Sequence, residues 1–177
     1  MLQVPAVRLA PVLMALLFGA PAFAEGFLSA PREAWVEGEV KLPAAPSESS
    51  LTEFFVSSES PNRFLIDRNT LRVDADDVVR YVLVVRTPGG AENVTFEGIR
   101  CDAGARRIYA SGRKGGEWAL LKNSEWVPIS YNTYNRPRAA LAIEVFCDGP
   151  VAPRGREEIL RRLDGLYDPA DFRQKDR

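Results

Sequence analysis

The feature that most constrains this chain is a series of four strand-like runs, separated by short turns, within residues 78–120. The first run, 78–86, is dense in β-branched and aromatic residues, which pack well on a pleated surface. Each turn contains Gly, and the first also contains Pro, which favours a tight reversal of the backbone. Connections this short join antiparallel neighbours, so 78–86 is followed in a predicted meander sheet by 93–101, 106–112 and 117–120. Because 78–86 is almost continuously apolar, we expect it to be the central strand, covered on both faces.

Two further strands are predicted earlier in the chain, at 51–56 and 64–67, where the apolar content rises. The acidic run 74–77 has some likeness to a calcium loop. It lacks the Gly and the distal Glu that the spacing of an EF-hand requires. We therefore interpret this run as a solvated turn that leads into the central strand. Residues 51–167 together are long enough for a single domain with one core.

The C-terminal part of the chain favours helices. Residues 138–146 are rich in alanine and follow Pro137, which the first turn of a helix tolerates. Apolar residues also alternate there as in a strand, but the alanines and the proline favour a helix. A second helix is predicted from apolar residues at helical spacing, namely Ile159, Leu160, Leu163, Leu166 and Tyr167. Residues 168–177 read as a polar tail. The expected fold is α+β, an antiparallel meander β-sheet of about five to seven strands with one or two C-terminal helices.

The chain contains two cysteines, Cys101 and Cys147, and no histidine. In an exported protein an isolated pair most simply forms one disulfide, worth about 3–4 kcal/mol at this spacing on the chain-entropy model. A redox-active pair would be expected closer together, as Cys-x-x-Cys, or beside a histidine. The lack of histidine also removes the commonest general base and the commonest zinc ligand. No metal site and no cofactor are predicted.

Residues 1–24 have the layout of a secretory signal peptide, with Arg8, a short apolar core and the small-x-small pattern at 22–24. The apolar stretch is too short to span a bilayer, which takes about 20 residues, and prolines interrupt it. We expect export to the periplasm, with outer-membrane association or display on the cell surface as alternatives. Residues 25–50 are mixed, with Trp35 as the one large anchor, and read as an extended arm or linker.

Charge and motifs argue against several classes of function. Without the single basic residue of 1–24, the chain has 22 basic and 24 acidic residues, which offers no reason to expect nucleic acid or anionic membrane as a partner. Ser111 does not lie in a Gly-x-Ser-x-Gly elbow, and the Gly-rich turns do not match phosphate-binding loops. A carboxylate pair is conceivable from Glu92, Glu97, Glu117 and Glu125, but solvated strand faces explain these residues equally well. We therefore expect no catalytic residues and no enzyme.

A binding surface has more support. Aromatic residues beside arginines are the usual anchors of recognition surfaces, and several cluster in the sequence around 121–136. The alternative is that both tryptophans close the end of the sheet core, since large aromatics dominate burial. The residues predicted for binding are Arg113, Trp118, Trp126, Tyr131 and Tyr134.

The order of residues over roughly 50–150 resembles the cryptic neisserial protein-like family of exported proteobacterial proteins. The runs that carry the resemblance are 64–67, 78–85, 90–94, 109–113 and, most specifically, Glu97-Gly98-Ile99-Arg100-Cys101. This family has no established activity, so the resemblance implies export but no chemistry. In layout alone the chain is also similar to surface adhesins of the protein E type, which pair a sheet cysteine with a C-terminal one.

These observations predict a non-enzymatic binding or accessory protein of the cell envelope. Its partner would be an envelope protein or a glycan. An adhesin-like surface module and, less favoured, a carboxylate-based envelope hydrolase are the alternatives. An apolar groove on the sheet would favour the binding protein, whereas a pair of carboxylates converging in a cleft would favour the hydrolase.

Overall fold

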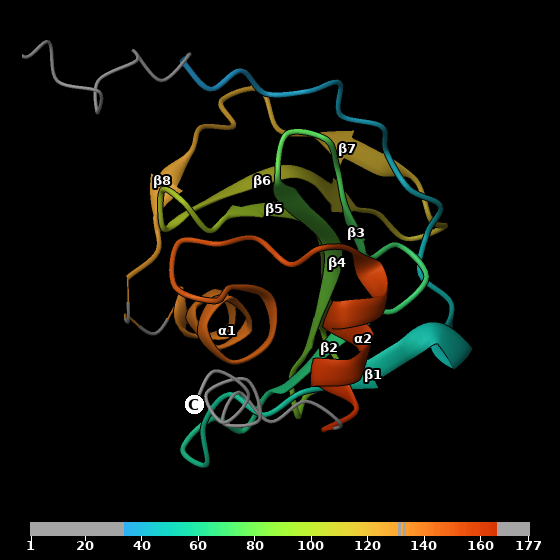
Figure 1. Ribbon diagram of the computed structural model, residues 1–177. Coiled ribbons are helices and arrows are strands. Elements are labelled where there is room, and N and C mark those ends of the chain that lie inside the picture. Colours follow the sequence, from blue (N-terminus) through green and yellow to red (C-terminus); the bar gives the residue numbers. More distant parts are fainter. Residues whose placement is uncertain (1–33, 131, 133, 166–177) are drawn as a thin grey trace, which may run out of the picture. The chain divides into compact units, whose positions relative to one another are not determined.

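The computed structural model describes residues 34–130, 132 and 134–165. Their core is an antiparallel sheet in the order β1-β2-β4-β5-β6-β7, with β3 beside β4 and β8 beside β6 (Figure 1). The strands are β1 (Leu51–Glu53), β2 (Arg63–Asp67), β3 (Arg72–Val73), β4 (Val78–Arg86), β5 (Glu92–Arg100), β6 (Ala105–Gly112), β7 (Trp118–Leu120) and β8 (Val127–Pro128). The predicted antiparallel meander is confirmed, and the strand count exceeds the expected range because β3 and β8 are short pieces of two residues.

Strand β4 is the centre of the sheet, as its apolar composition predicted. It pairs along its whole length with β5 and on its other side with β2 and β3. Successive side chains of a strand point to opposite faces, so β4 serves two cores. Val79, Tyr81 and Leu83 contribute to one apolar cluster, and Val82 and Val84 to the other. Burial of each such side chain stabilises the fold by roughly 1.5–3 kcal/mol.

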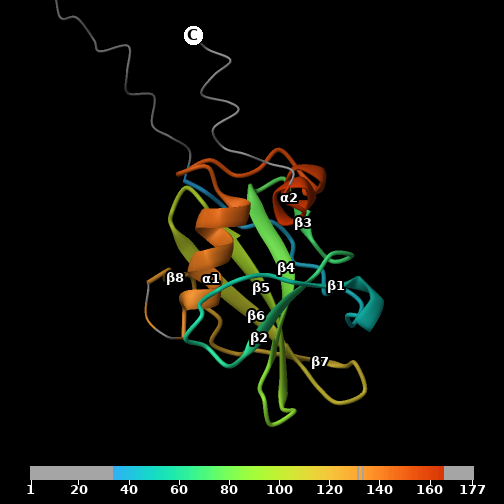
Figure 2. The ribbon, with the colours of Figure 1, turned by 90° about the horizontal axis from the view of Figure 1, so that it is seen from below.

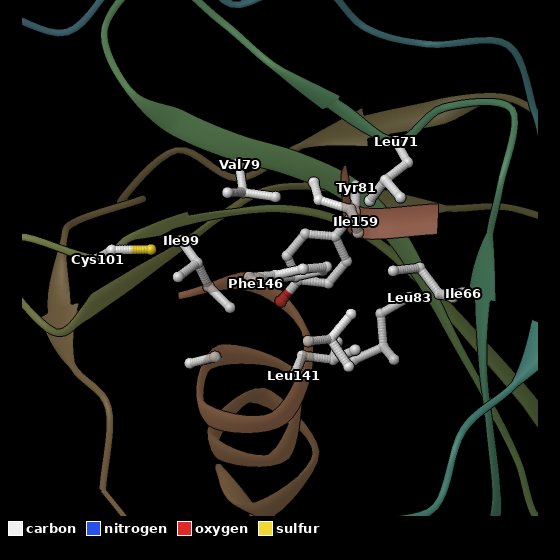
Figure 3. Packing of buried hydrophobic residues seen from close by; sticks show 12 residues of the cluster. Ile66, Leu71, Val79, Tyr81, Leu83, Ile99, Cys101, Leu141, Phe146 and Ile159 are labelled. Carbon is white, nitrogen blue, oxygen red and sulfur yellow. The ribbon is translucent and has the colours of Figure 1, made fainter. Parts of the chain in front are cut away.

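Helices cover the first of these faces (Figures 1 and 2). Helix α1 (Arg136–Ala140) continues without a break into a π-helix, η2 (Leu141–Phe146), and α2 (Arg156–Leu163) packs against it. The helix predicted over 138–146 is thus confirmed, beginning two residues earlier. Figure 3 shows the apolar side chains that meet between sheet and helices, with the rings of Tyr81 and Phe146 only 5.0 Å apart between centroids.

The second predicted helix is α2, which contains three of its expected apolar residues. Ile159 is fully buried, and Leu160 and Leu163 pack against the same cluster. Leu166 and Tyr167 lie outside the described residues, as do the proposed signal segment and the polar tail. Among the described residues no helix combines the length and apolar character needed to cross a bilayer.

The second face of the sheet is covered by an extended segment, residues 35–47, which we call the arm (blue in Figure 1). It has no strand or helix of its own until the short 3-10 turn η1 (Glu48–Ser50). Side chains and backbone fix it at several points. The Trp35 indole N–H donates to the Asp76 carbonyl at 2.9 Å, and the Trp118 indole N–H donates to the Pro43 carbonyl at 2.8 Å. The described part of the predicted arm or linker therefore packs on the domain.

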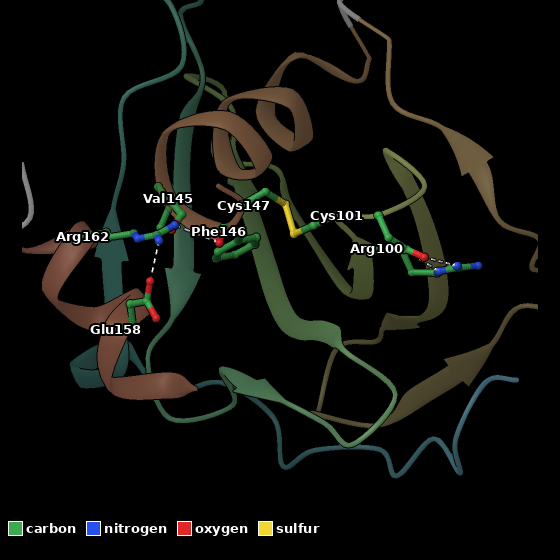
Figure 4. The surroundings of a disulfide bond; sticks show 8 residues. Arg100, Cys101, Val145, Phe146, Cys147, Glu158 and Arg162 are labelled. Carbon is green, nitrogen blue, oxygen red and sulfur yellow. Dashed lines mark hydrogen bonds and ion pairs between the residues drawn. A yellow bond between two sulfur atoms is a disulfide. The ribbon is translucent and has the colours of Figure 1, made fainter. Parts of the chain in front are cut away.

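The disulfide joins the sheet to the helical layer. Cys101 directly follows β5 and Cys147 directly follows η2, and their sulfurs are bonded at 2.03 Å (Figure 4). The predicted pairing is confirmed. Beside it, Arg162 of α2 donates to the backbone carbonyls of Val145 and Phe146 and pairs with Glu158 (Figure 4). The end of η2 is thereby attached both to the sheet and to the last helix.

Candidate functional site

A mainly apolar pocket opens beside the disulfide, between the end of β5 and the π-helix. Its volume is about 310 Å³. Both cysteines contribute to its wall, and the other lining residues are Ile99, Arg100, Gly104, Ile129, Ala142, Ile143 and Gly149. The pocket thus combines residues from the sheet, from the loop after β8 and from η2.

Short-range backbone geometry assembles the sheet side of this pocket. The chain reverses after Cys101 through Gly104, whose φ of +54° lies in the left-handed region that favours glycine. Ile129 directly follows β8, which pairs with β6, and its amide donates to the Gly104 carbonyl at 2.8 Å. This bond holds the Ile129 side chain near the pocket, although the residue is distant in sequence from β5.

The π-helix forms the opposite wall. Its wider turn is seen where the Cys147 amide donates to the Ala142 carbonyl, five residues back, at 2.8 Å. Both of these residues line the pocket, together with Ile143, which is 53% exposed. Leu141, Val145 and Phe146 point instead into the core. π-helical turns are rare and are frequently found at functional sites, so their presence in this wall singles the pocket out.

The lining contains one ionisable residue, Arg100, and its charge is engaged elsewhere. The Arg100 side chain points away from the disulfide (Figure 4). It donates to Asp102 at 2.6 Å and 3.1 Å, and its guanidinium carbon lies 3.5 Å from the centre of the Trp35 ring. The pocket therefore holds no nucleophile, general acid or general base. Its mainly aliphatic walls can contact an apolar group.

A buried charged cluster lies deeper under the helices. Glu97 is fully buried and accepts hydrogen bonds from Arg138, at 2.8 Å from Nε, from the Tyr81 hydroxyl at 3.1 Å and from the Thr95 hydroxyl. Burial, together with the charge of Glu97, raises the pKa of Tyr81 well above its usual value, so the hydroxyl remains a donor. The expectation that Glu97 lies on a solvated strand face is wrong, because Arg138 from α1 neutralises it inside the core.

A second charged cluster lies on the opposite face, under the arm. Arg80 is fully buried in the middle of β4 and donates to Asp74 at 2.7 Å and to Asp76 at 2.7 and 2.9 Å. Burial alone would raise the pKa of Asp76, but hydrogen bonds from Arg80 and the Gly38 amide outweigh it and lower that pKa to about 2. The acidic run 74–77 is thus a turn, as predicted, but only part of it is solvated. Ala75 and Asp77 are exposed, whereas Asp74 and Asp76 bind a buried guanidinium.

The carboxylates of these clusters are engaged by arginines. Asp74 and Asp76 do converge beside a hollow of about 290 Å³, but both serve as acceptors for Arg80. No group of three or more His, Cys, Asp or Glu side chains suited to a metal ion occurs in the part of the chain that the structure describes.

The residues predicted for binding do not come together. Trp118 and Trp126 lie on the arm face, packed against the second apolar cluster, and Trp126 meets Trp35 edge to face at 5.7 Å. Tyr134 lies with the helices, where its ring stacks on Arg138, with 4.8 Å between the guanidinium carbon and the ring centre, and is 60% exposed. Arg113 is exposed in the turn before β7. Tyr131 lies outside the described residues.

Sequence reasoning missed the apolar walls of the pocket. The sequence indicates Ile99 only as part of a family-like run, and it predicts structural roles for Ile129, Ala142 and Ile143. The cysteine pair was the one available signal, because a disulfide brings two distant segments together. Nothing in 141–146 predicts a π-helix rather than an α-helix.

Comparison with known proteins agrees with the resemblance in the sequence. The sequence model of the CNP1-like family matches residues 30–164. The chain is 28% identical, over an alignment of 123 residues, to Cryptic neisserial protein 1 of Neisseria gonorrhoeae. The alignment covers 61% of the chain and 60% of that relative, which is less than two thirds of the relative's length. No solved structure gives a significant match. Because the family match spans well over half of the chain, this protein belongs to the CNP1-like family.

Proposed function

We propose that this protein is a non-enzymatic binding or accessory protein of the cell envelope, and that the pocket beside Cys101 and Cys147 receives an apolar group of a protein partner. The observation that carries the proposal is the pocket itself, walled by a disulfide, a π-helix and aliphatic side chains. It is the kind of groove expected of a binding protein and not of a hydrolase.

The chemistry of the pocket supports binding over catalysis. Its one ionisable lining residue is engaged with Asp102 and Trp35. The nearby carboxylate of Glu97 is buried and saturated by Arg138, Tyr81 and Thr95. A general acid or base needs a reachable proton and an open partner position. Neither is offered by the groups around this pocket.

The size of the pocket favours a side chain of a protein as its occupant. Small-molecule sites usually range over about 300–1,000 Å³, and this pocket stands at the lower end. Burial of one Leu or Phe side chain contributes roughly 1.5–3 kcal/mol. Such an anchor would give specificity within a broader interface rather than high affinity on its own.

The disulfide supports the envelope as the place of action. Disulfides persist in oxidising compartments such as the bacterial periplasm and are rare in the cytosol. Here the bond also forms the pocket wall, so an oxidising compartment would preserve the binding site. Export itself rests on the signal-like segment 1–24, which lies outside the described residues.

A site-specific photocross-linker tests the proposal. Placed at Ile143 in the exported protein, it should capture one envelope protein in stoichiometric yield. Val151 is the matched control, because it is also apolar and exposed, at 61%, but does not line the pocket. Replacing Ile129 with Asp should abolish capture from position 143. Equal capture from both positions, or none from position 143, would refute a binding role for the pocket.

A further inference from the structure

The arm is attached to the sheet by side-chain contacts and not by strand pairing. In the described structure no backbone–backbone hydrogen bond joins residues 35–46 to a strand. The Gly38 amide instead donates to the Asp76 carboxylate at 2.8 Å, and the Lys41 carbonyl accepts from Arg72 at 2.9 Å. Hollows of about 290 and 390 Å³ lie beside it, and Gly38 lines both. The arm thus resembles a peptide laid in a groove.

One carboxylate of the arm, Glu37, occupies a position built from four donors of the sheet face. Its oxygens accept hydrogen bonds from Arg107 Nη1, from the Tyr109 hydroxyl at 2.7 Å and from the Trp126 indole N–H at 3.2 Å. Arg80 Nη2 lies 3.6 Å away. Burial, and then the contact with Glu37, raises the pKa of Tyr109, so its hydroxyl stays a donor. Charge-assisted hydrogen bonds of this kind are the strong ones.

A second position, two residues earlier, recognises an aromatic ring. Trp35 lies between the Arg100 guanidinium, 3.5 Å from its ring centre, and the edge of Trp126. Its indole N–H donates to the Asp76 carbonyl. In an extended segment residues i and i+2 point to the same side, so both anchors face the sheet while Val36 between them is 79% exposed. The two positions together, which we call the seat, hold a segment of the pattern Trp-x-Glu.

A short segment connects the anchored part of the arm to η1. Within it the Pro43 carbonyl accepts from the Trp118 indole, whereas residues 44–46 have no regular structure and no hydrogen bond in the described structure. Exchange of an identical element between protomers preserves its contacts and is therefore a low-cost route to a dimer. A foreign peptide would have to displace the arm against its high local concentration. A second copy of the chain differs from a foreign peptide because each displaced arm can bind the seat of the other copy.

We propose that the seat is a recognition site for an extended Trp-x-Glu segment, and that two copies of this protein exchange their arms through it. The occupant in the dimer is the arm of the other copy, held by the same four donors around Glu37 and the same aromatic position around Trp35. This site shares one residue, Arg100, with the lining of the apolar pocket, and its other residues lie outside that pocket, so the inference does not depend on the proposed function.

A complementation experiment on the full-length exported protein tests the exchange. Glu37→Ala gives a chain with a defective arm and an intact seat, and Arg107→Ala gives a chain with an intact arm and a defective seat. In a mixture of the two, only exchange can place an intact arm on an intact seat. Sedimentation equilibrium should show 1:1 pairs at a concentration at least tenfold below that at which either chain dimerises alone.

Another carboxylate of the arm provides the control for this experiment. Glu39 is an exposed carboxylate of the same arm with no hydrogen bond or ion pair in the described structure. A mixture of Glu39→Ala and Arg107→Ala should therefore form no more 1:1 pairs than a mixture of wild type and Arg107→Ala. Sedimentation of the mixture as the sum of its parts up to about 1 mM, the usual effective concentration of a short tether, would overturn the proposal. If Arg107→Ala fails to fold, Tyr109→Phe replaces it, because it removes one donor and keeps the ring.

A peptide probe examines the seat itself. A peptide of residues 35–42 should bind the Glu37→Ala chain and dissociate the 1:1 pairs. The same peptide with Gln at position 37 should bind at least tenfold more weakly. Equal binding of the two peptides would show that the carboxylate is not recognised, and the proposal would then be wrong.

Discussion

The two faces of this sheet each bury an arginine, but they cover it differently. Under the helices, Arg138 and Glu97 neutralise each other within a layer that a disulfide and α2 hold in place. Under the arm, Arg80 is held by Asp74 and Asp76, and Glu37 completes the cluster from a segment without strand pairing. A buried arginine is thus part of a disulfide-linked core on one face and of a contact with an extended segment that lacks strand pairing on the other.

If the arm exchanges as we propose, burial of a charge does not by itself distinguish a structural site from a recognition site. What differs is the segment that covers the buried charge, which is the helical layer on one face and the arm on the other. On the helical face, loss of the cover requires the core to open. On the arm face, the donors around Glu37 remain assembled on rigid strands when the arm leaves, because Arg107 and Tyr109 both belong to β6.

The largest loss in the free energy of unfolding is expected from a substitution on the helical face. Glu97→Gln would leave Arg138 as an uncompensated buried charge, and breaking such a pair typically costs about 3–5 kcal/mol. Urea unfolding should show this loss in the free energy of unfolding. A loss below about 1 kcal/mol would mean that the pair behaves as a solvated one, and the comparison between the faces would fail.

Removal of the disulfide should rank next. Cys147→Ser opens the cross-link between β5 and η2, and the chain-entropy model predicts a loss of about 3–4 kcal/mol. Cross-linking from Ile143 should be lost as well, because Cys147 forms part of the pocket wall. The indole hydrogen bonds of the arm should persist in the folded fraction. Release of the arm on loss of the disulfide would contradict the independence of the two faces.

A smaller loss of stability is expected on the arm face when the pH is lowered, because Asp76 becomes protonated. The pKa of Asp76 in the folded protein is about 2, below its usual value of 3.8. Its stabilising effect is therefore complete above about pH 5 and is lost as the pH falls through 3.8 towards 2. A shift of this size corresponds to about 2 kcal/mol. The difference in unfolding free energy between wild type and Asp76→Asn should shrink over that range, and a constant difference would contradict the assignment.

The smallest effect on stability is expected at Glu37. Glu37→Gln weakens several charge-assisted hydrogen bonds, for which a loss of about 1–3 kcal/mol is typical. Tryptophan fluorescence should change more than stability does, because Trp35 and Trp126 meet at this position. Glu39→Gln is the control and should leave both unchanged. If Glu37→Gln cost as much as Glu97→Gln, the arm would be as integral to the core as the helices are.

Much of the fold could be predicted because local chemistry and tertiary structure agree. In 78–120 the β-branched composition and the Gly-containing turns both point to a meander, and β4 to β7 follow it closely. The cysteine pairing followed from there being only two. The run 97–101 was singled out as distinctive. In the structure Glu97 enters the helical core, Ile99 and Cys101 line the pocket, and Arg100 supports Trp35.

The rest depended on contacts between residues far apart in sequence. Arg80 interrupts an apolar strand, and only the folded structure shows that two aspartates of the preceding turn and Glu37 surround it. Gly98 has no local role, but a Cβ there would lie 2.6 Å from the Tyr109 hydroxyl, so glycine leaves room for a donor of the seat. Propensity and periodicity do not carry such information, which is why the sequence does not distinguish an arm from a linker over residues 25–50.

Native-state hydrogen exchange compares the two faces most directly. The Gly38 amide and the Trp35 indole N–H report the arm, and the Cys147 amide reports the helical layer. We expect the arm protons to exchange through a local opening, at least about a hundredfold faster than the Cys147 amide, which should exchange only with global unfolding. Equal protection at these three positions would show that the arm and the helices form one cooperative unit, and arm exchange would then be excluded.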